Sequence, residues 1–192
     1  MADDDAEARE EVHEDEAAPE PPPVPSDEIA AALVAQFPDG VFTESHGQPV
    51  VYVPREQWHD VATFLRDEQQ FTQCLDVTAV DQLVAPARAI PAAVAAERFE
   101  VVANFLSHVR NRRIRVIAQV PVDDPTIASI TDLYPGVNFA ERETYDLFGI
   151  EFTDHPDLTR ILMPDDWLGH PLRKDDAPAR VPVTFKGDPS PR

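Results

Sequence analysis

Cysteine is nearly absent from this chain of 192 residues, in which Cys74 is the single example. One thiol cannot form an internal disulfide, which suits a reducing compartment. Iron–sulfur clusters normally take four thiolates, and structural zinc sites usually take at least two. The sequence therefore argues against either centre within this chain. Because no histidine is adjacent to it, Cys74 is expected to be a small buried apolar residue.

Glycine is also scarce, and the six glycines are isolated, without a G-x-G or a G-K-[ST] pattern. This excludes the usual dinucleotide fingerprint and the P-loop. Long apolar runs are missing as well, since the stretch 84–96 is broken by Arg88 and two prolines and falls far short of the roughly 20 residues that span a bilayer. The N-terminus is acidic, without a secretory core or the arginines of a transit peptide. We expect a bacterial protein that stays in the cytoplasm.

Basic residues are outnumbered, and the formal net charge is −20. Residues 1–28 hold twelve acids and one base, and residues 29–192 hold 24 acids and 15 bases. Such a charge disfavours binding of nucleic acid and favours a basic or mixed protein surface as partner. Residues 1–25 are acidic, rich in proline and free of aromatic residues, so they are predicted to be a disordered tail.

Residues 26–150 predict an α+β domain, in which helices cover an antiparallel or mixed sheet. Ser26 is the expected cap of the first helix. After Phe71, the alternation of Leu75, Val77 and Ala79 with polar residues predicts a strand with these three side chains inward. Helices are expected over 27–37, 54–68, 126–133 and 139–148, and strands over 41–45, 49–53, 98–108 and 114–120.

The segment VNFAERETYDLFGIEF has the features of a well-terminated helix. Asn138 is a candidate cap, with Glu141 three residues on reaching back in a capping box. Gly149 stands where a left-handed C-terminal cap is wanted. Arg142 and Asp146 are four residues apart and are expected to pair.

Residues 151–192 are interpreted as an extended arm. In HPDLTRILMPDDWLGHPLRKDD the prolines Pro156, Pro164 and Pro171 forbid a long helix, although apolar residues and Trp167 are frequent. These apolar side chains must therefore be buried either against the chain's own domain or against another chain. Tryptophan and arginine are common in protein–protein hot spots, which favours an arm that wraps a partner.

Two chemical alternatives remain for these segments. A zinc site at His155 and His170, which lie among carboxylates, is conceivable, but each histidine is followed directly by proline. Glu141, Glu143 and Asp146 could form a catalytic acid cluster, although capping and pairing explain these carboxylates more economically.

Together the two segments resemble the 30 kDa-type subunit of respiratory complex I, often called its C subunit, over about 35 residues in the same order and spacing. The first motif consists of Glu141, Arg142, Glu143, Asp146, Leu147, Phe148, Gly149, His155 and Arg160. The second motif consists of Asp166, Trp167, Gly169, His170, Pro171, Leu172, Arg173, Lys174 and Asp175. The acidic tail and the residues after Asp176 are not part of the family pattern.

The resemblance implies a peripheral subunit on the cytoplasmic side of the bacterial cell membrane, in a proton-translocating NADH:quinone oxidoreductase. It implies that the two motifs face the 49 kDa-type subunit (the D subunit), close to the cluster-bearing subunits B and I. It implies no catalytic or cofactor-binding residue in this chain, with FMN and iron–sulfur clusters in partner subunits. The equivalent subunit of a membrane-bound hydrogenase, or of another quinone-linked complex, is the alternative. A stand-alone soluble enzyme that uses the acidic cluster is a further one.

Overall fold

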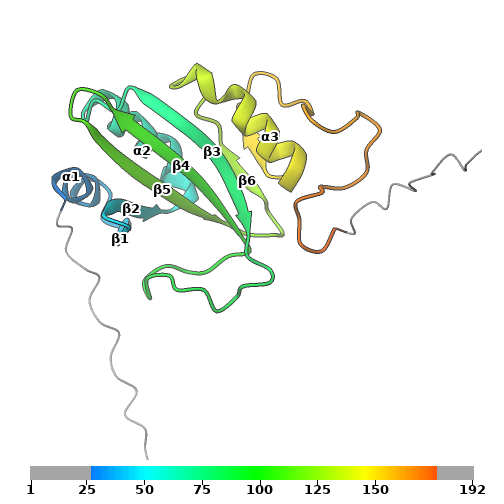
Figure 1. The fold of residues 1–192 in the computed structure, drawn as a ribbon, viewed down its shortest axis with the longest axis horizontal. Coiled ribbons are helices and arrows are strands. Elements are labelled where there is room, and N and C mark those ends of the chain that lie inside the picture. The colour runs from blue at the N-terminus through cyan, green and yellow to red at the C-terminus, as the bar shows by residue number, and fades with distance from the viewer. Residues whose placement is uncertain (1–26, 177–192) are drawn as a thin grey trace, which may run out of the picture.

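The computed structural model describes residues 27–176, in which helices pack against a mixed five-stranded sheet (Figure 1). The strands lie in the order β1-β2-β5-β4-β3; β2 and β5 run parallel, and the other neighbours run antiparallel. Their bounds are β1 (Val41–Ser45), β2 (Gln48–Val53), β3 (Gln73–Asp81), β4 (Phe99–Ser107) and β5 (Arg112–Val120). The expected α+β class is confirmed. The predicted tail, residues 1–25, and the last part of the predicted arm lie outside the described residues.

The α-helices of the described range are α1 (Glu28–Gln36), α2 (Trp58–Asp67) and α3 (Asn138–Phe148), and short 3-10 helices at Arg55–Gln57 and Pro135–Val137 lead into α2 and α3. A second, two-stranded sheet pairs β6 (Thr126–Ala128) with β7 (Glu151–Thr153) in parallel. In Figure 1, α2 lies behind the large sheet and α3 lies beside β3. Within residues 27–176, every helix is too short or too polar to cross a lipid bilayer.

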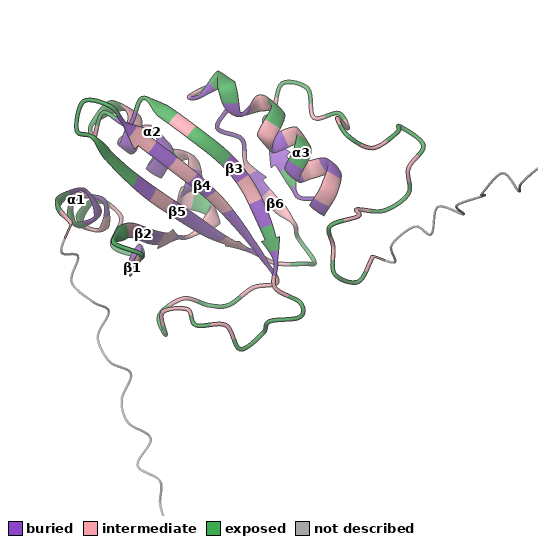
Figure 2. Ribbon diagram, viewed as in Figure 1, coloured by how far each residue is buried: buried purple, intermediate pink, exposed green. Residues whose placement is uncertain are grey.

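The core lies on the face of the sheet that α2 covers. Along β4, Phe99, Val101, Ala103 and Phe105 point to this face and are at most 1% exposed. From the other side of the core, the hydroxyl of Tyr134 donates to the carbonyl of Phe71 at 2.8 Å, and its ring lies 5.4 Å from that of Phe105. Figure 2 shows buried residues along β4 and β5, whereas the segment after β7 is mostly intermediate or exposed. Every second side chain of β4, from Phe99 to Phe105, faces the core, which is the period of two expected of a half-buried strand.

The opposite face of the sheet carries polar contacts instead of a helix. The side chain of Glu100 points to this face, and the residue is only 6% exposed. It accepts hydrogen bonds from Arg88 at 2.9 Å, Gln119 at 2.9 Å and Gln82 at 2.8 Å. Arg88 and Gln82 belong to the expected loop between β3 and β4. The loop is therefore attached to the outer face by one buried carboxylate.

The strands expected over 41–45 and 49–53 are β1 and β2, and they form a hairpin. Ser45 pairs with Gln48, and the two turn residues His46 and Gly47 have φ values of 52° and 72°. Two successive positive φ values define the tight turn that fits the right-handed twist of a hairpin. At the start of α1, Asp27 is the cap, because its carboxylate accepts the backbone N–H groups of residues 29 and 30. The predicted cap, Ser26, lies outside the described residues.

The predicted helix over 126–133 is wrong. Thr126–Ala128 is β6, and Ile127, only 3% exposed, pairs with Phe152 of β7. The partner strand is about 25 residues further along the chain, so the neighbouring residues of β6 do not reveal which strand it pairs with. The two β-branched residues Thr126 and Ile127 did favour a strand over a helix.

The prediction for Leu75 is also wrong, because this side chain is 42% exposed. A β-bulge between Cys74 and Asp76 shifts the register of β3, which turns Leu75 out of the core. Val77 and Ala79, beyond the bulge, are buried as expected. Cys74 is half-buried against the core, and burial raises the pKa of its thiol to about 12.

Candidate partner-binding site at the end of the third helix

Most residues of the second motif, together with Asp146, Gly149 and Arg160 of the first, lie around the C-terminal end of α3, whereas Glu141 and His155 lie at its first turn. Residues 159–176, which we call the C-terminal loop, leave β7 and return to this helix end. The loop has no regular secondary structure, as its prolines required. Its shape is therefore set by side-chain contacts with the rest of the domain.

Asp146 holds the start of the C-terminal loop. Its carboxylate is fully buried and accepts the backbone N–H groups of Ile161, Leu162 and Met163 at 2.8–3.1 Å. Arg160 donates to the same carboxylate at 2.6 Å. Burial alone would raise the pKa of Asp146, but these donors outweigh it and hold the pKa below its ordinary value. One helical carboxylate thus organises a turn of four consecutive residues.

The other end of the C-terminal loop caps α3. The last carbonyls of a helix have no partner within the helix. Here Leu172 donates its backbone N–H to the carbonyl of Leu147 at 3.0 Å, and Arg173 donates to the carbonyl of Phe148 at 2.5 Å. The imidazole Nδ1 of His170 lies 3.0 Å from the carbonyl oxygen of Asp146. The cation of Arg173 also suits the negative end of the helix dipole.

Gly149 terminates α3, as predicted. Its φ is 71°, and its N–H donates to the carbonyl of Tyr145 at 2.8 Å. A Cβ at this position would lie 2.5 Å from Nε2 of His170 and 2.7 Å from Nη2 of Arg173. Glycine is therefore needed both for the left-handed backbone and for the close approach of the loop.

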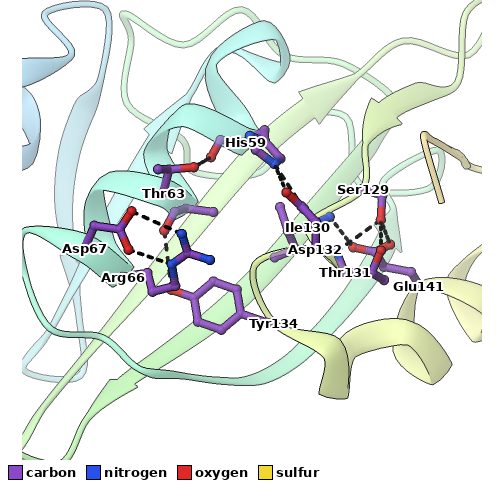
Figure 3. A network of polar contacts seen from close by, with 11 residues as sticks. His59, Thr63, Arg66, Asp67, Ser129, Ile130, Thr131, Asp132, Tyr134 and Glu141 are labelled. Carbon is purple, nitrogen blue, oxygen red and sulfur yellow. Dashed lines mark hydrogen bonds and ion pairs between the residues drawn. The ribbon is translucent and has the colours of Figure 1, made fainter. Parts of the chain in front are cut away.

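Glu141 does not form the predicted capping box. Asn138 already has helical dihedrals, the cap position is Val137, and no side chain caps the helix. The carboxyl of Glu141 is instead fully buried, and it accepts the hydroxyl of Ser129 at 2.6 Å and the N–H of Ile130 at 2.9 Å (Figure 3). Burial outweighs these hydrogen bonds and raises the pKa of Glu141 to about 7. The residue thus ties α3 to the segment after β6.

His155 lies against this buried carboxyl. Its side chain is fully buried, and its Nε2 lies 3.9 Å from Oε2 of Glu141. The backbone N–H of Asp157 donates to Nδ1 at 3.1 Å, so the neutral ring carries its proton on Nε2. Burial lowers the pKa of His155, which favours this neutral form.

The predicted pair between Arg142 and Asp146 is wrong. Arg142 donates to the carbonyl and the hydroxyl of Thr159, at 3.0 and 2.8 Å, and to the carbonyl of Arg160 at 3.2 Å. The partner of Asp146 is Arg160. Arg142 and Asp146 of α3 thus hold the C-terminal loop, whereas Glu143 on the same helix is exposed.

Several other motif residues have side chains that are open to solvent. Glu143, Asp166, Lys174 and Asp175 are exposed, and Trp167 is half-buried. Three apolar residues nearby are largely exposed: Leu168 at 92%, Phe139 at 64% and Leu162 at 59%. The site therefore combines an anchored backbone with an outward surface of apolar and charged side chains, an arrangement suited to binding a protein.

A catalytic or metal-binding use finds less support in the geometry. Within residues 27–176, no three histidine, cysteine or carboxylate side chains lie close enough to hold a metal ion. The carboxylates of Glu141 and Asp146 both accept hydrogen bonds from other groups of this chain. A cavity of about 400 Å³ lies elsewhere, between β2, Arg55 and the loop residues Val94 and Glu97, and no motif residue lines it.

Comparison with known proteins agrees with the motifs. Residues 51–181 match the family model described as the 30 kDa subunit of the respiratory-chain NADH dehydrogenase. The chain belongs to this family.

Relatives of the 30 kDa subunit family share substantial identity with the chain. It is 41% identical over 170 residues to the C subunit of the NADH-quinone oxidoreductase of Salinispora arenicola, a match that covers 84% of this chain and 65% of the relative. It is 44% identical over 147 residues to the C subunit of the same enzyme from Geobacter sulfurreducens, covering 75% of this chain and 84% of the relative. The chain thus spans about two thirds of the length of the Salinispora relative.

Two solved structures share the fold. A trypsin-resistant fragment (residues 1–134) of Nqo5 superposes with a TM-score of 0.59 at 31% identity, covering 68% of this chain and 96% of the fragment. A chain of the archaeal membrane-bound sulfane sulfur reductase gives the same TM-score of 0.59 at 19% identity, covering 85% of this chain and 95% of that one. The second likeness shows the fold alone.

Proposed function

We propose that this chain is a structural subunit of a proton-translocating NADH:quinone oxidoreductase. In this role it supports electron transfer from NADH to quinone by packing against the 49 kDa-type subunit, close to subunits B and I. It carries no redox centre and performs no catalytic step, and FMN and iron–sulfur clusters belong to partner subunits. It lies on the cytoplasmic side of the bacterial membrane, which it contacts only through the complex.

One observation carries this proposal: the family motifs fold into an anchored loop that presents apolar side chains to solvent. Leu168 is 92% exposed, although Met163 before it donates to Asp146 and the carbonyl of Gly169 after it accepts from Arg160. Ordering a chain segment costs conformational entropy, and an exposed leucine contributes no hydrophobic free energy to offset that cost in the free subunit. Burial of this surface by a neighbouring subunit would supply the offsetting free energy. The single cysteine supports the same proposal, since a cluster normally needs four thiolates.

The proposal predicts that Leu168→Asp weakens assembly without unfolding the subunit. The substitution places a charge in an apolar interface, so we expect at least a roughly tenfold loss of the 49 kDa-type subunit retained on the tagged chain. Val109→Asp is the matched control, because Val109 is 76% exposed in the turn between β4 and β5, away from the motifs. Equal retention of the partner by wild type and by Leu168→Asp would contradict the proposed interface.

An equivalent place in a related membrane-bound oxidoreductase is the second candidate. The fold shared with the sulfane sulfur reductase chain favours it, although identity there is only 19%. The partners retained on the tagged chain separate the two candidates. A large subunit with cysteine pairs that bind nickel and iron would indicate a hydrogenase, and a partner without them would favour the NADH-linked enzyme.

A further inference from the structure

A second buried carboxylate, outside both motifs, holds the far end of the C-terminal loop. Asp81 is the last residue of β3, and its side chain is fully buried. It accepts the backbone N–H of Lys174 at 2.8 Å and that of Leu83 at 3.0 Å. Arg98 donates to it twice, at 3.1 and 2.8 Å. Asp81 and Lys174 are 93 residues apart in the sequence, so this contact closes a long loop.

Arg98 joins the same contact to the next residue of the loop. Its guanidinium donates to Asp175 at 2.9 and 2.5 Å, and it lies 14% exposed between Asp81 and Asp175. The guanidinium carbons of Arg98 and Arg173 lie 4.9 and 5.2 Å from the ring centre of Phe99, within the range of cation–π attraction. The loop end is therefore attached by charge, by hydrogen bonds and by contact with a core aromatic ring.

Asp146 and Asp81 each attach one end of the C-terminal loop to the domain, and the segment between these ends is largely exposed. Asp146 holds residues 161–163, and Asp81 with Arg98 holds residues 174 and 175. Trp167 and the 92% exposed Leu168 lie between these ends. Release of the Asp81 end would leave the contacts of residues 170, 172 and 173 with α3 as the remaining attachment on that side. The loop would then sample more shapes, and binding would have to restore one of them at an entropic cost.

We propose that Asp81 and Arg98 are positioning residues that hold the C-terminal loop in a preformed shape for the neighbouring subunit. This inference rests on the proposed function, since it assumes that the loop binds a partner. It assigns a role to two residues that neither motif includes. A binding-competent loop that is already populated in the free subunit raises the apparent affinity in proportion to its population.

The test combines amide hydrogen exchange with binding of the 49 kDa-type subunit, using the full-length chain. In Asp81→Asn we expect the amides of residues 172–176 to lose protection at least tenfold, while those of residues 161–163 stay protected. The partner should bind about tenfold more weakly, because the competent shape is less populated. Asp165→Asn is the matched control: this exposed carboxylate lies in the same loop and makes no hydrogen bond among the described residues.

A second variant tests the same contact in case Asp81→Asn misfolds. The Asp175 side chain is 53% exposed, so Asp175→Asn removes its ion pair with Arg98 without touching the core. It should reduce protection and affinity in the same direction, by a smaller factor. Unchanged protection in both variants, or lost protection with unchanged partner affinity, would overturn the positioning role. A wild-type chain that binds no partner while its loop is protected would instead overturn the proposed function.

Discussion

Two carboxylates of one helix differ in pKa because they meet different donors. Asp146 accepts three backbone N–H groups and the guanidinium of Arg160, and the pKa of its carboxyl lies below the ordinary value. Glu141 is just as buried but accepts only a hydroxyl and one N–H, and its pKa is raised to about 7. Charge-assisted donors thus decide whether a buried carboxyl stays ionised.

The raised pKa of Glu141 predicts a measurable dependence of stability on pH. The pKa of Glu141 is about 7 in the folded state and 4.5 in the unfolded chain. As the pH rises, the unfolded state therefore loses this proton at a lower pH than the folded state does. The contribution of Glu141 to stability is therefore complete below about pH 4.5 and falls as the pH rises to about 7, by about 3 kcal/mol. Glu141→Gln cannot ionise and should lose this dependence. Urea unfolding between pH 4.5 and 8 measures it.

The informative quantity is the difference in unfolding free energy between variant and wild type at each pH, because other groups titrate in both. This difference should shift in favour of Glu141→Gln as the pH rises. Glu143→Gln is the control, since Glu143 lies two residues further on the same helix with an exposed side chain. Parallel pH profiles for wild type and Glu141→Gln would show that Glu141 is ionised in the folded protein over this range.

At the scale of elements, the end of α3 is completed by residues distant in sequence. The carbonyls of Asp146, Leu147 and Phe148 are met by groups from residues 170–173, not by the residues that follow the helix directly. The helix end and the loop consequently stabilise one another. A change at the point of contact should therefore affect both.

Gly149→Ala tests this dependence. A left-handed backbone costs a residue with a Cβ about 1–2 kcal/mol, and here the new Cβ would also lie 2.5 Å from His170. We expect a loss of about 2 kcal/mol or more in unfolding free energy and faster amide exchange at residues 170, 172 and 173. Chemical denaturation and hydrogen exchange measure the two effects.

Two other glycines separate the causes. Gly47 has a φ of 72°, but a Cβ added there would meet nothing within 4 Å, so Gly47→Ala should show the backbone cost of about 1 kcal/mol and leave the loop protected. Gly136 has neither a positive φ nor a close neighbour, and Gly136→Ala should be near neutral. Normal amide protection of residues 170, 172 and 173 in Gly149→Ala would argue against a shared helix–loop contact.

For the whole molecule, the C-terminal loop connects α3 with the far end of β3. Asp81 lies at the end of the sheet and Asp146 at the end of the helix, and one continuous loop contacts both. Burial by itself would raise the pKa of Asp81, but Arg98 and two backbone N–H groups lower it to about 2. The attachment of the loop is therefore linked to pH.

Acid should release the loop before the domain unfolds. Because the folded pKa of Asp81 lies below its ordinary value of 3.8, its stabilisation is complete above about pH 4 and is lost as the pH falls towards 2. Trp167 reports on the loop, and Trp58, 1% exposed, reports on the core. In a Trp58→Phe background we expect a red shift of Trp167 emission between pH 4 and 2, ahead of the loss of helical circular dichroism.

Trp58→Phe is a mild background, because the indole N–H of Trp58 is buried without a hydrogen-bond partner among the described residues. In Asp81→Asn the emission of Trp167 should already be red-shifted at neutral pH and change little in acid. Simultaneous loss of the fluorescence and circular dichroism signals would show that loop and domain unfold as one unit.

Local sequence predicted the elements whose signals lie within a few residues. The strands on either side of His46-Gly47, the helix α2 and the end of α3 at Gly149 are of this kind, since backbone dihedrals and the period of apolar residues determine them. The two motifs also identified the region that forms the site. Their role at a partner surface stays a prediction.

Only the tertiary structure decided which partners the charged residues find. Sequence spacing paired Arg142 with Asp146 and placed Glu141 in a capping box, yet each of these side chains bonds to a segment elsewhere in the chain. The strand β6 and the anchor Asp81 were missed for the same reason, because their partners lie about 25 and 93 residues away. A local pair is worth only a few tenths of a kcal/mol on a helix surface. Burial and charge-assisted bonds across the fold outweigh it.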